Sequence, residues 1–479
     1  MRKKFLSGLG VILLLNVLIK PTYVLGIEAA VQNAVGAESF GLYAAILSLS
    51  FLFNIVLDFG MTNFNTRNIA QNQQLLNKHF SGLFSLRFLL AIIYFIFIFS
   101  VGVALGYLKD NWLIFTLLSI NQFLASGILY LRSNLNGLLL FKQDAVVSVM
   151  DRALLIIGLG SLLLFPEYFG AFQIEWLVIG QTIAYGVAFL FAFAMVFRNL
   201  DAFRIQLKLP FAWMILKKSL PFALLILLSM AYYKTDSVML ERMLPNGDYH
   251  AGIYAMGFRF FEASNMIGFL FAGLLLPLFS RLFKLQESID EVAQVAFQML
   301  LSLGVILGAF CYLYGSEILH LFYSNHQAEA LIPFQLLMSA FIFVLVGYLF
   351  STILTAKGEL KKMNFLAIGG VVLNIGLNVL LIQKWQETGS ALASLITQGL
   401  VCLLQIILVI RLVKLRFSTK TILRMTFFLT LVGILMVSFT IIRWTWWLEG
   451  GFFIALTAVC AILTGFLQIN QLAELFDRR

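Results

Sequence analysis

Apolar segments long enough to cross a lipid bilayer recur along nearly all 479 residues of the chain. A helix needs roughly 20 apolar residues to span the hydrocarbon core, and on that measure we expect about fourteen spans. They are residues 8–31, 40–62, 81–107, 112–140, 146–165, 174–197, 220–240, 252–279, 292–314, 331–355, 363–382, 390–410, 422–442 and 451–469. Only 12% of the residues are charged, too few to cover a soluble protein of this size. The sequence therefore predicts an all-α integral membrane protein.

Basic residues alternate in abundance along the connections between these spans. The odd-numbered connections carry Lys109, Arg242, Lys384 and Arg443, and the even-numbered connections and both tails carry many more. The tenth and twelfth connections, for example, hold Lys357, Lys361, Lys362, Arg411, Lys414, Arg416 and Lys420. Since the side of a membrane protein that is richer in Lys and Arg faces the cytoplasm, we expect both termini in the cytoplasm. This alternation accounts for the net charge of +10, so no nucleic-acid partner is expected.

Short stretches of the first half return in the second half in the same order. Residues 41–44 (GLYA) return as 252–255 (GIYA), and residues 157–159 (IGL) return as 375–377. Six spans separate the copies, so the two halves are expected to lie parallel, related by an axis along the membrane normal. We expect a first lobe at residues 1–200, a second lobe at 201–415 and two accessory spans with a cytoplasmic tail at 416–479.

Several ionisable side chains fall inside the expected spans, where a charge costs roughly 2.5–3.5 kcal/mol. Lys20 and Lys234 lie deep in the first and seventh spans, which are equivalent helices of the two lobes. Such residues persist where they face a wet cavity or a partner. We expect a cationic cavity that suits an anionic group such as a diphosphate, lined by Lys20, Arg132, Arg152, Lys234 and Arg259. Two carboxylates in these spans are candidates for coupling transport to a proton or a cation, namely Asp236 and Glu262.

The same charges also allow local ion pairs without a shared cavity. The pairs would be Arg152 with Asp151 or Asp58, Lys234 with Asp236, and Arg259 with Glu262. The cavity is the stronger interpretation for the deep Lys20, Lys234 and Arg259, and the two interpretations are balanced for Arg132 and Arg152. Arg87 and Glu28 lie near span ends and are expected to reach the interface, and Asp58 is expected to have a structural role at a helix end.

Cys and His residues do not form a metal-binding pattern in this sequence. The chain has 3 Cys and 4 His, and neither type shows the paired spacing of a metal site. No metal and no cofactor is therefore expected, apart from a coupling proton or cation. Lys20 also interrupts the first apolar run, and no small-residue cleavage site follows it, so we expect an uncleaved first span.

Motifs along the chain resemble those of a known family. They are FGLY at 40–43, LDFG at 57–60, RNIA at 67–70, KKSLP at 217–221, Asp236, GIY at 252–254, Pro277 and Ser280-Arg281. With these motifs and its spans the chain resembles the polysaccharide flippases, Wzx-type lipid-linked oligosaccharide translocases of the multidrug/oligosaccharidyl-lipid/polysaccharide (MOP) exporter superfamily. The related lipid II flippases use cavity arginines, and Lys20 stands in the first span where an Arg would be expected, so the resemblance does not assign the chain to that subgroup.

This resemblance implies a fold, a substrate and a location. The fold is a V-shaped pair of six-helix lobes, as in multidrug exporters and lipid II flippases. The implied activity moves an undecaprenyl-diphosphate-linked oligosaccharide from the inner to the outer leaflet of the bacterial cytoplasmic membrane, for surface polysaccharide biosynthesis. The implied partners are the polyprenyl-diphosphate-linked glycan, the bilayer, and polysaccharide polymerase or assembly proteins.

Two other functions fit a polytopic membrane protein. A cation-coupled multidrug exporter of the same superfamily favours an acidic cavity, which the basic excess within the spans disfavours. A membrane-embedded polysaccharide polymerase or glycosyltransferase needs a sizeable outer loop with paired carboxylates or Arg, and the connections here are too short. The sequence therefore predicts a transporter rather than an enzyme.

Overall fold

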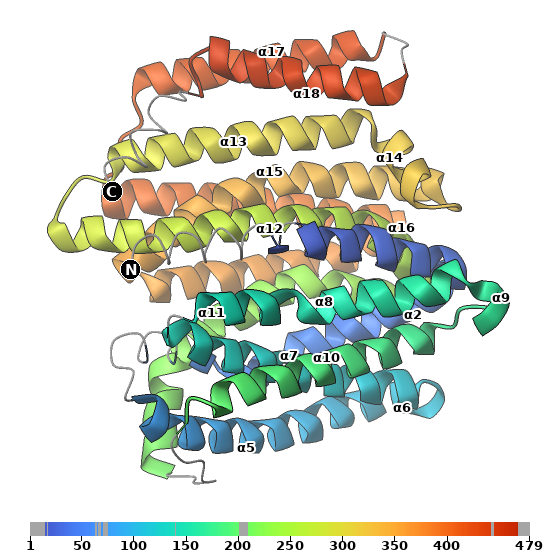
Figure 1. The fold of residues 1–479 in the computed structure, drawn as a ribbon. Helices are drawn as coiled ribbons and strands as arrows, with labels where there is room; N and C mark the ends of the chain where they lie inside the picture. The colour runs from blue at the N-terminus through green and yellow to red at the C-terminus, as the bar shows by residue number, and fades with distance from the viewer. Residues whose placement is uncertain are drawn as a thin grey trace. The chain divides into compact units, whose positions relative to one another are not determined.

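All regular secondary structure in the described part of the chain is helical. The structure is a computed structural model that describes residues 15–16, 18–62, 65, 69, 75–138, 140–200, 209–441 and 445–467. Contacts divide it into two compact units, residues 1–252 and 253–479 (Figure 1). The tails that carry part of the predicted basic excess, and most of the RNIA motif at 67–70, lie outside the described residues.

The first unit contains the helices up to the first turn of α12. They are η1 (Thr22–Ile27), α2 (Glu28–Phe53), α3 (Ile55–Asp58), α5 (Leu75–Ala104), α6 (Tyr107–Asp110), α7 (Trp112–Gly137), α8 (Phe141–Leu164), α9 (Pro166–Phe169), α10 (Ile174–Phe197), α11 (Leu209–Met243) and α12 (Gly247–Leu285). Helix α10 packs on α7 and α8, and α11 packs along α2. A buried core of Phe80, Leu131 and Ala188 joins α5, α7 and α10.

The second unit contains the rest of α12 and the helices that follow it. They are α13 (Asp290–Leu313), α14 (Gly315–Phe322), α15 (Gln327–Lys357), α16 (Leu360–Val413), α17 (Thr419–Phe439) and α18 (Trp446–Leu463). Helix α15 packs between α13 and α16, and α17 and α18 pack on each other and on α13. Phe334, Phe341 and Phe350 of α15 are fully buried and form the centre of this unit.

Twelve helical segments of the described chain are long and apolar enough to cross a membrane. Two of them, with 41 and 54 residues, are about twice the length that one crossing needs. Each contains a break in the helical backbone, at Gly36 with φ 85° and at Gln386 with φ 50°. Dividing both segments at their breaks accounts for the fourteen expected spans. The predicted all-α membrane fold is confirmed.

The repeated glycine motif has a packing role inside the first unit. A Cβ atom on Gly41 of α2 would lie 1.7 Å from the carbonyl oxygen of Asp248, and one on Gly252 would lie 2.0 Å from that of Ala37. The side chain of Gln32 also donates a hydrogen bond to the carbonyl oxygen of Gly252, at 2.9 Å. Both repeats therefore place a glycine where α2 and the start of α12 touch backbone to backbone, as small residues do in membrane helix pairs.

The boundary between the two units falls after Gly252, inside α12. Helix α11 belongs to the first unit, consistent with its packing along α2. The lobes predicted at 1–200 and 201–415, with accessory spans at 416–479, follow the order of the sequence repeat rather than the density of contacts. That division stays a prediction.

Candidate functional site

Three of the predicted cationic residues come together in the first unit. The ammonium of Lys20 lies within electrostatic reach of Arg132 on α7 and Arg152 on α8, and of the carboxylates of Asp144 and Asp151 on α8. Lys20 is half-buried and lies directly before Pro21, the residue that caps η1. We call these five side chains the Lys20 cluster. They bring together parts of the chain more than a hundred residues apart in the sequence.

Both guanidinium groups of the Lys20 cluster already have a carboxylate partner. Arg132 Nε lies 2.6 Å from Asp144 Oδ1, and Arg132 Nη2 lies 3.2 Å from Asp144 Oδ2, a two-point contact. Arg152 Nε lies 3.6 Å from Asp151 Oδ2, so the local pair that the sequence allowed for Arg152 is present. Lys20 makes no hydrogen bond or ion pair with another described residue. A third carboxylate, Glu28 on α2, also lies within electrostatic reach of Arg152. Lys20 is therefore distinguished by having no carboxylate partner of its own among the described residues, and not by an excess of charge.

Aromatic side chains from two helices hold the guanidinium of Arg152. Its Cζ atom lies 4.6 Å from the ring centroid of Tyr23 in η1 and 5.5 Å from that of Tyr185 in α10. Gln181 of α10 donates to the hydroxyls of Tyr23 at 3.1 Å and of Tyr43 in α2 at 2.7 Å. Helix η1 is a π-helix, a rare form that is frequent at functional sites. Tyr23 lies in this π-helical segment. The rings of Tyr23 and Tyr185 fix the position of Arg152 through cation–π contacts.

Lys234 and Asp236 lie on α11 of the same unit, in different surroundings. Lys234 Nζ lies 5.2 Å from the ring centroid of Phe51 on α2. Asp236 is 1% exposed. The pair of Lys234 with Asp236 that the sequence allowed stays a prediction.

Arg259 and Glu262 lie on α12 in the second unit. Arg259 is 3% exposed, and its Nη1 donates to the hydroxyl of Tyr323 at 2.8 Å. That hydroxyl in turn donates to the carbonyl oxygen of Met256 at 3.3 Å. Glu262 follows one turn later and is half-buried. The structure thus brings Lys20, Arg132 and Arg152 together, and the shared cavity with Lys234 and Arg259 stays a prediction.

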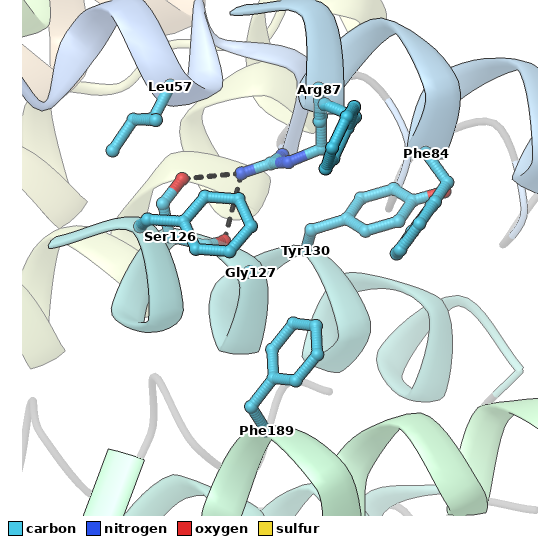
Figure 2. A pocket seen from close by; sticks show the side chains of 9 residues that line it. Leu57, Phe84, Arg87, Ser126, Gly127, Tyr130 and Phe189 are labelled. Atoms are coloured by element: carbon cyan, nitrogen blue, oxygen red, sulfur yellow. Dashed lines mark hydrogen bonds between the residues drawn. The ribbon is translucent and has the colours of Figure 1, made fainter. Parts of the chain in front are cut away.

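Arg87 was expected to reach the membrane interface, and this expectation is wrong. Its side chain is 8% exposed, and its Nη1 lies 2.6 Å from Asp58 Oδ1. Its Nη2 donates to the backbone oxygen of Ser126 at 2.9 Å and to its hydroxyl at 2.7 Å (Figure 2). Asp58 also accepts a hydrogen bond from the backbone N–H of Thr62 at 3.2 Å, which confirms its structural role at a helix end.

A small cavity lies beside this buried ion pair. It holds about 30 Å³, enough for one or two water molecules. Arg87 and Ser126 border it on one side, and the rings of Phe84, Tyr130 and Phe189 border it on the others (Figure 2). The partners Arg87 and Asp58 are 29 positions apart, so helical spacing within the sequence gave no sign of their pairing.

Buried polar groups inside α16 form a second feature that the span map did not predict. Asn374, Ser390 and Thr397 are fully buried, and Asn374 Nδ2, Ser390 Oγ and Thr397 Oγ1 have no hydrogen-bond partner among the described residues. A Cβ atom on Gly370 would lie 3.0 Å from Val401, so the two arms of α16 pack face to face. Buried polar atoms are almost always satisfied, so ordered water is expected to complete their hydrogen bonding.

Comparison with known proteins places the chain in a family. The model of the family described as "Polysaccharide biosynthesis protein" matches residues 5–283. An uncharacterized membrane protein of Methanocaldococcus jannaschii, MJ1375, is 22% identical over 398 residues, which are 79% of this chain and 92% of that protein.

Solved structures share the fold at low sequence identity. The lipid II flippase MurJ in an inward closed conformation matches with a TM-score of 0.64 and 15% identity, over 98% of this chain and 100% of that one. A multidrug resistance MATE family transporter of the MOP superfamily, in an inward-facing conformation, matches with a TM-score of 0.62 and 16% identity, over 81% of this chain and 93% of that one. The resemblance drawn from the motifs is confirmed: the chain belongs to the polysaccharide biosynthesis protein family and is a multi-pass membrane protein with the fold of the MOP superfamily.

Proposed function

We propose that the protein is a flippase for an undecaprenyl-diphosphate-linked oligosaccharide, which it moves from the inner to the outer leaflet of the bacterial cytoplasmic membrane. The observation that carries this proposal is the Lys20 cluster. An ammonium group without a carboxylate of its own lies within electrostatic reach of two guanidinium groups inside a helical bundle. Family membership directs the interpretation to polysaccharide biosynthesis.

The chemistry of the cluster suits a diphosphate better than a neutral sugar. Asp144 pairs with Arg132 and Asp151 pairs with Arg152, while Lys20 has no carboxylate partner of its own. Phosphate oxygens form short, charge-assisted hydrogen bonds with ammonium and guanidinium groups. A phosphate that enters the cluster would therefore neutralise Lys20 without breaking either aspartate pair. The polyprenyl tail would remain in the bilayer during this exchange.

The proposal extends to the remaining predicted residues and to the mechanism. Lys234 and Arg259 would line the same path as the headgroup crosses by alternating access, with both termini in the cytoplasm. Asp236 and Glu262 would couple this movement to a proton or a cation, since a deeply placed carboxylate is costly when it is ionised without a counter-charge.

Deletion of the gene and complementation test this function. Loss of the protein should abolish surface polysaccharide and cause lipid-linked repeat units to accumulate on the cytoplasmic side. Wild type and Lys20→Arg should restore the polysaccharide, and Lys20→Gln should not. Lys142→Gln is the matched control, because Lys142 is an exposed cation on α8, the helix that carries Arg152. Unchanged surface polysaccharide in the deletion strain would contradict the proposal.

A cation-coupled multidrug exporter is the second candidate. The fold likeness to the MATE family transporter favours it, and so do the two aspartates that pair with both guanidinium groups of the Lys20 cluster. Under this alternative, the deletion strain becomes sensitive to cationic drugs and its glycans remain normal. The flippase proposal expects the opposite pattern.

A further inference from the structure

We propose that one end of the second unit is a binding surface for the headgroups of anionic phospholipids. Six exposed cations lie there, at the two ends of α16, in the connection between α16 and α17, and at the start of α17. They are Lys361, Lys362, Arg411, Lys414, Arg416 and Lys420, and we call them the basic end. The inference concerns the protein's lipid environment and does not depend on the proposed flippase activity.

Hydrogen bonds between neighbouring elements hold the two connections together. Lys357, at the end of α15, donates to the carbonyl oxygen of Leu412, near the end of α16. The start of α13 ties down the second connection, because Gln294 donates to the carbonyl oxygen of Arg416 at 2.9 Å and Asp290 accepts from its N–H at 3.3 Å. The backbone that carries the basic end is therefore a joined surface rather than two separate loops.

Exposed apolar side chains next to the cations indicate the depth at which the cations lie relative to the membrane. Phe365 of α16 is 80% exposed and lies one turn beyond Lys361. Leu423 and Phe427 of α17 are 66% and 59% exposed and lie within two turns of Lys420. Both helices are long and apolar enough to cross a membrane, so these side chains face acyl chains. At about 1.5 Å per residue, the cations then lie roughly 5–10 Å further out, at the level of the headgroups.

The charge of this surface selects an anionic headgroup over a zwitterionic one. Lys362 Nζ lies 3.1 Å from Glu359 Oε2, and α13 begins there with Asp290 and Glu291. With Lys357 included, seven basic side chains are opposed by these three carboxylates, an excess of four positive charges. Basic clusters at the end of a membrane helix attract anionic lipids. The positive-inside rule requires basic residues on this side of the membrane, but it does not require them to be gathered on one joined surface.

A charge-neutralising variant tests the proposal. Lys361→Gln/Arg416→Gln/Lys420→Gln removes three charges whose exposed side chains are not needed for the backbone contacts above. The control Arg198→Gln/Arg281→Gln/Lys284→Gln removes three exposed cations at the ends of α10 and α12. The purified full chain, in a neutral detergent, is titrated with phosphatidylglycerol or phosphatidylcholine, and native mass spectrometry counts the bound lipid.

Wild type and control should retain phosphatidylglycerol in preference to phosphatidylcholine. The basic-end variant should bind phosphatidylglycerol on the order of 100-fold more weakly, which is the effect of three charges near an anionic surface. Equal losses of phosphatidylglycerol binding in both triple variants would mean that net charge alone determines the binding, and would overturn the proposal. Binding of soluble polyglutamate without preference for phosphatidylglycerol would assign the surface to an acidic protein partner instead.

Discussion

The buried ion pair between Arg87 and Asp58 permits a quantitative prediction about stability. Asp58→Asn keeps the shape of the side chain but leaves the guanidinium of Arg87 buried, with its two bonds to Ser126 and no counter-charge. Breaking a buried pair by removing one partner costs about 3–5 kcal/mol. The side chain of Asp58 is 19% exposed, and an amide oxygen still accepts one hydrogen bond, so we expect the lower end, about 3 kcal/mol.

The partner variant completes a double-mutant cycle. Arg87→Met leaves the less buried Asp58 with its bond from Thr62, and should cost about 2–3 kcal/mol by the same reasoning. The double variant should cost about 2 kcal/mol less than the sum of the single variants, because the second change removes a charge that has already lost its partner. Equilibrium unfolding of the purified protein in mixed detergent–SDS micelles measures all four corners of the cycle.

A matched surface change serves as the control for this cycle. Arg198→Met removes an exposed Arg at the end of α10 and should change the free energy of unfolding by less than about 0.5 kcal/mol. Strict additivity of the Asp58 and Arg87 variants would refute the reasoning, since it would mean that the two side chains do not interact in the folded membrane protein.

Three further predictions follow from contacts in the first unit. Gly252→Val should prevent the close crossing of α2 and α12 and abolish the folded protein in detergent, measured by size-exclusion chromatography. The control variant Gly26→Ala should give the folded protein in the same assay, because a Cβ atom at Gly26 meets nothing within 4 Å. Tyr107→Phe removes a hydroxyl that donates to Glu241 Oε2 at 2.6 Å and should lower the free energy of unfolding by about 1–2 kcal/mol. Tyr185→Leu should lower the rate of transport to a smaller fraction of the wild-type value than it lowers the free energy of unfolding, because it removes one of the rings beside Arg152. An equal effect of Tyr185→Leu on both readouts would assign that ring to packing alone.

The membrane fold was predictable because apolar length and loop charge are properties of the sequence itself. Each expected span corresponds to a helical segment. The glycine repeat at 41–44 and 252–255 was interpreted as a sign of two related lobes, and the close helix contact at Gly41 and Gly252 was not predicted from it. The break at Gln386 also falls inside the connection expected between residues 382 and 390. Its conformation was not predictable, since the positive φ occurs at a residue that ordinarily avoids it.

The candidate site was predictable in part, for a related physical reason. The cost of a charge in the bilayer is enough to single out Lys20, Arg132 and Arg152 from the sequence alone. The same argument did not reveal that Asp144 is the partner of Arg132, or that Arg87 is buried with Asp58. These pairings join different helices, so they depend on how the bundle packs. The spacing of residues along one helix carries no information about that packing.

Direct binding of a diphosphate tests the central claim, that Lys20, which has no carboxylate partner of its own, selects an anionic headgroup. A short-chain polyprenyl-diphosphate disaccharide is titrated into purified wild type, Lys20→Gln and Lys142→Gln, and the dissociation constant is measured at low and high salt. Loss of one charge-assisted hydrogen bond should weaken binding by Lys20→Gln about 10- to 150-fold, and Lys142→Gln should bind like wild type. Equal affinity in all three proteins would contradict the account.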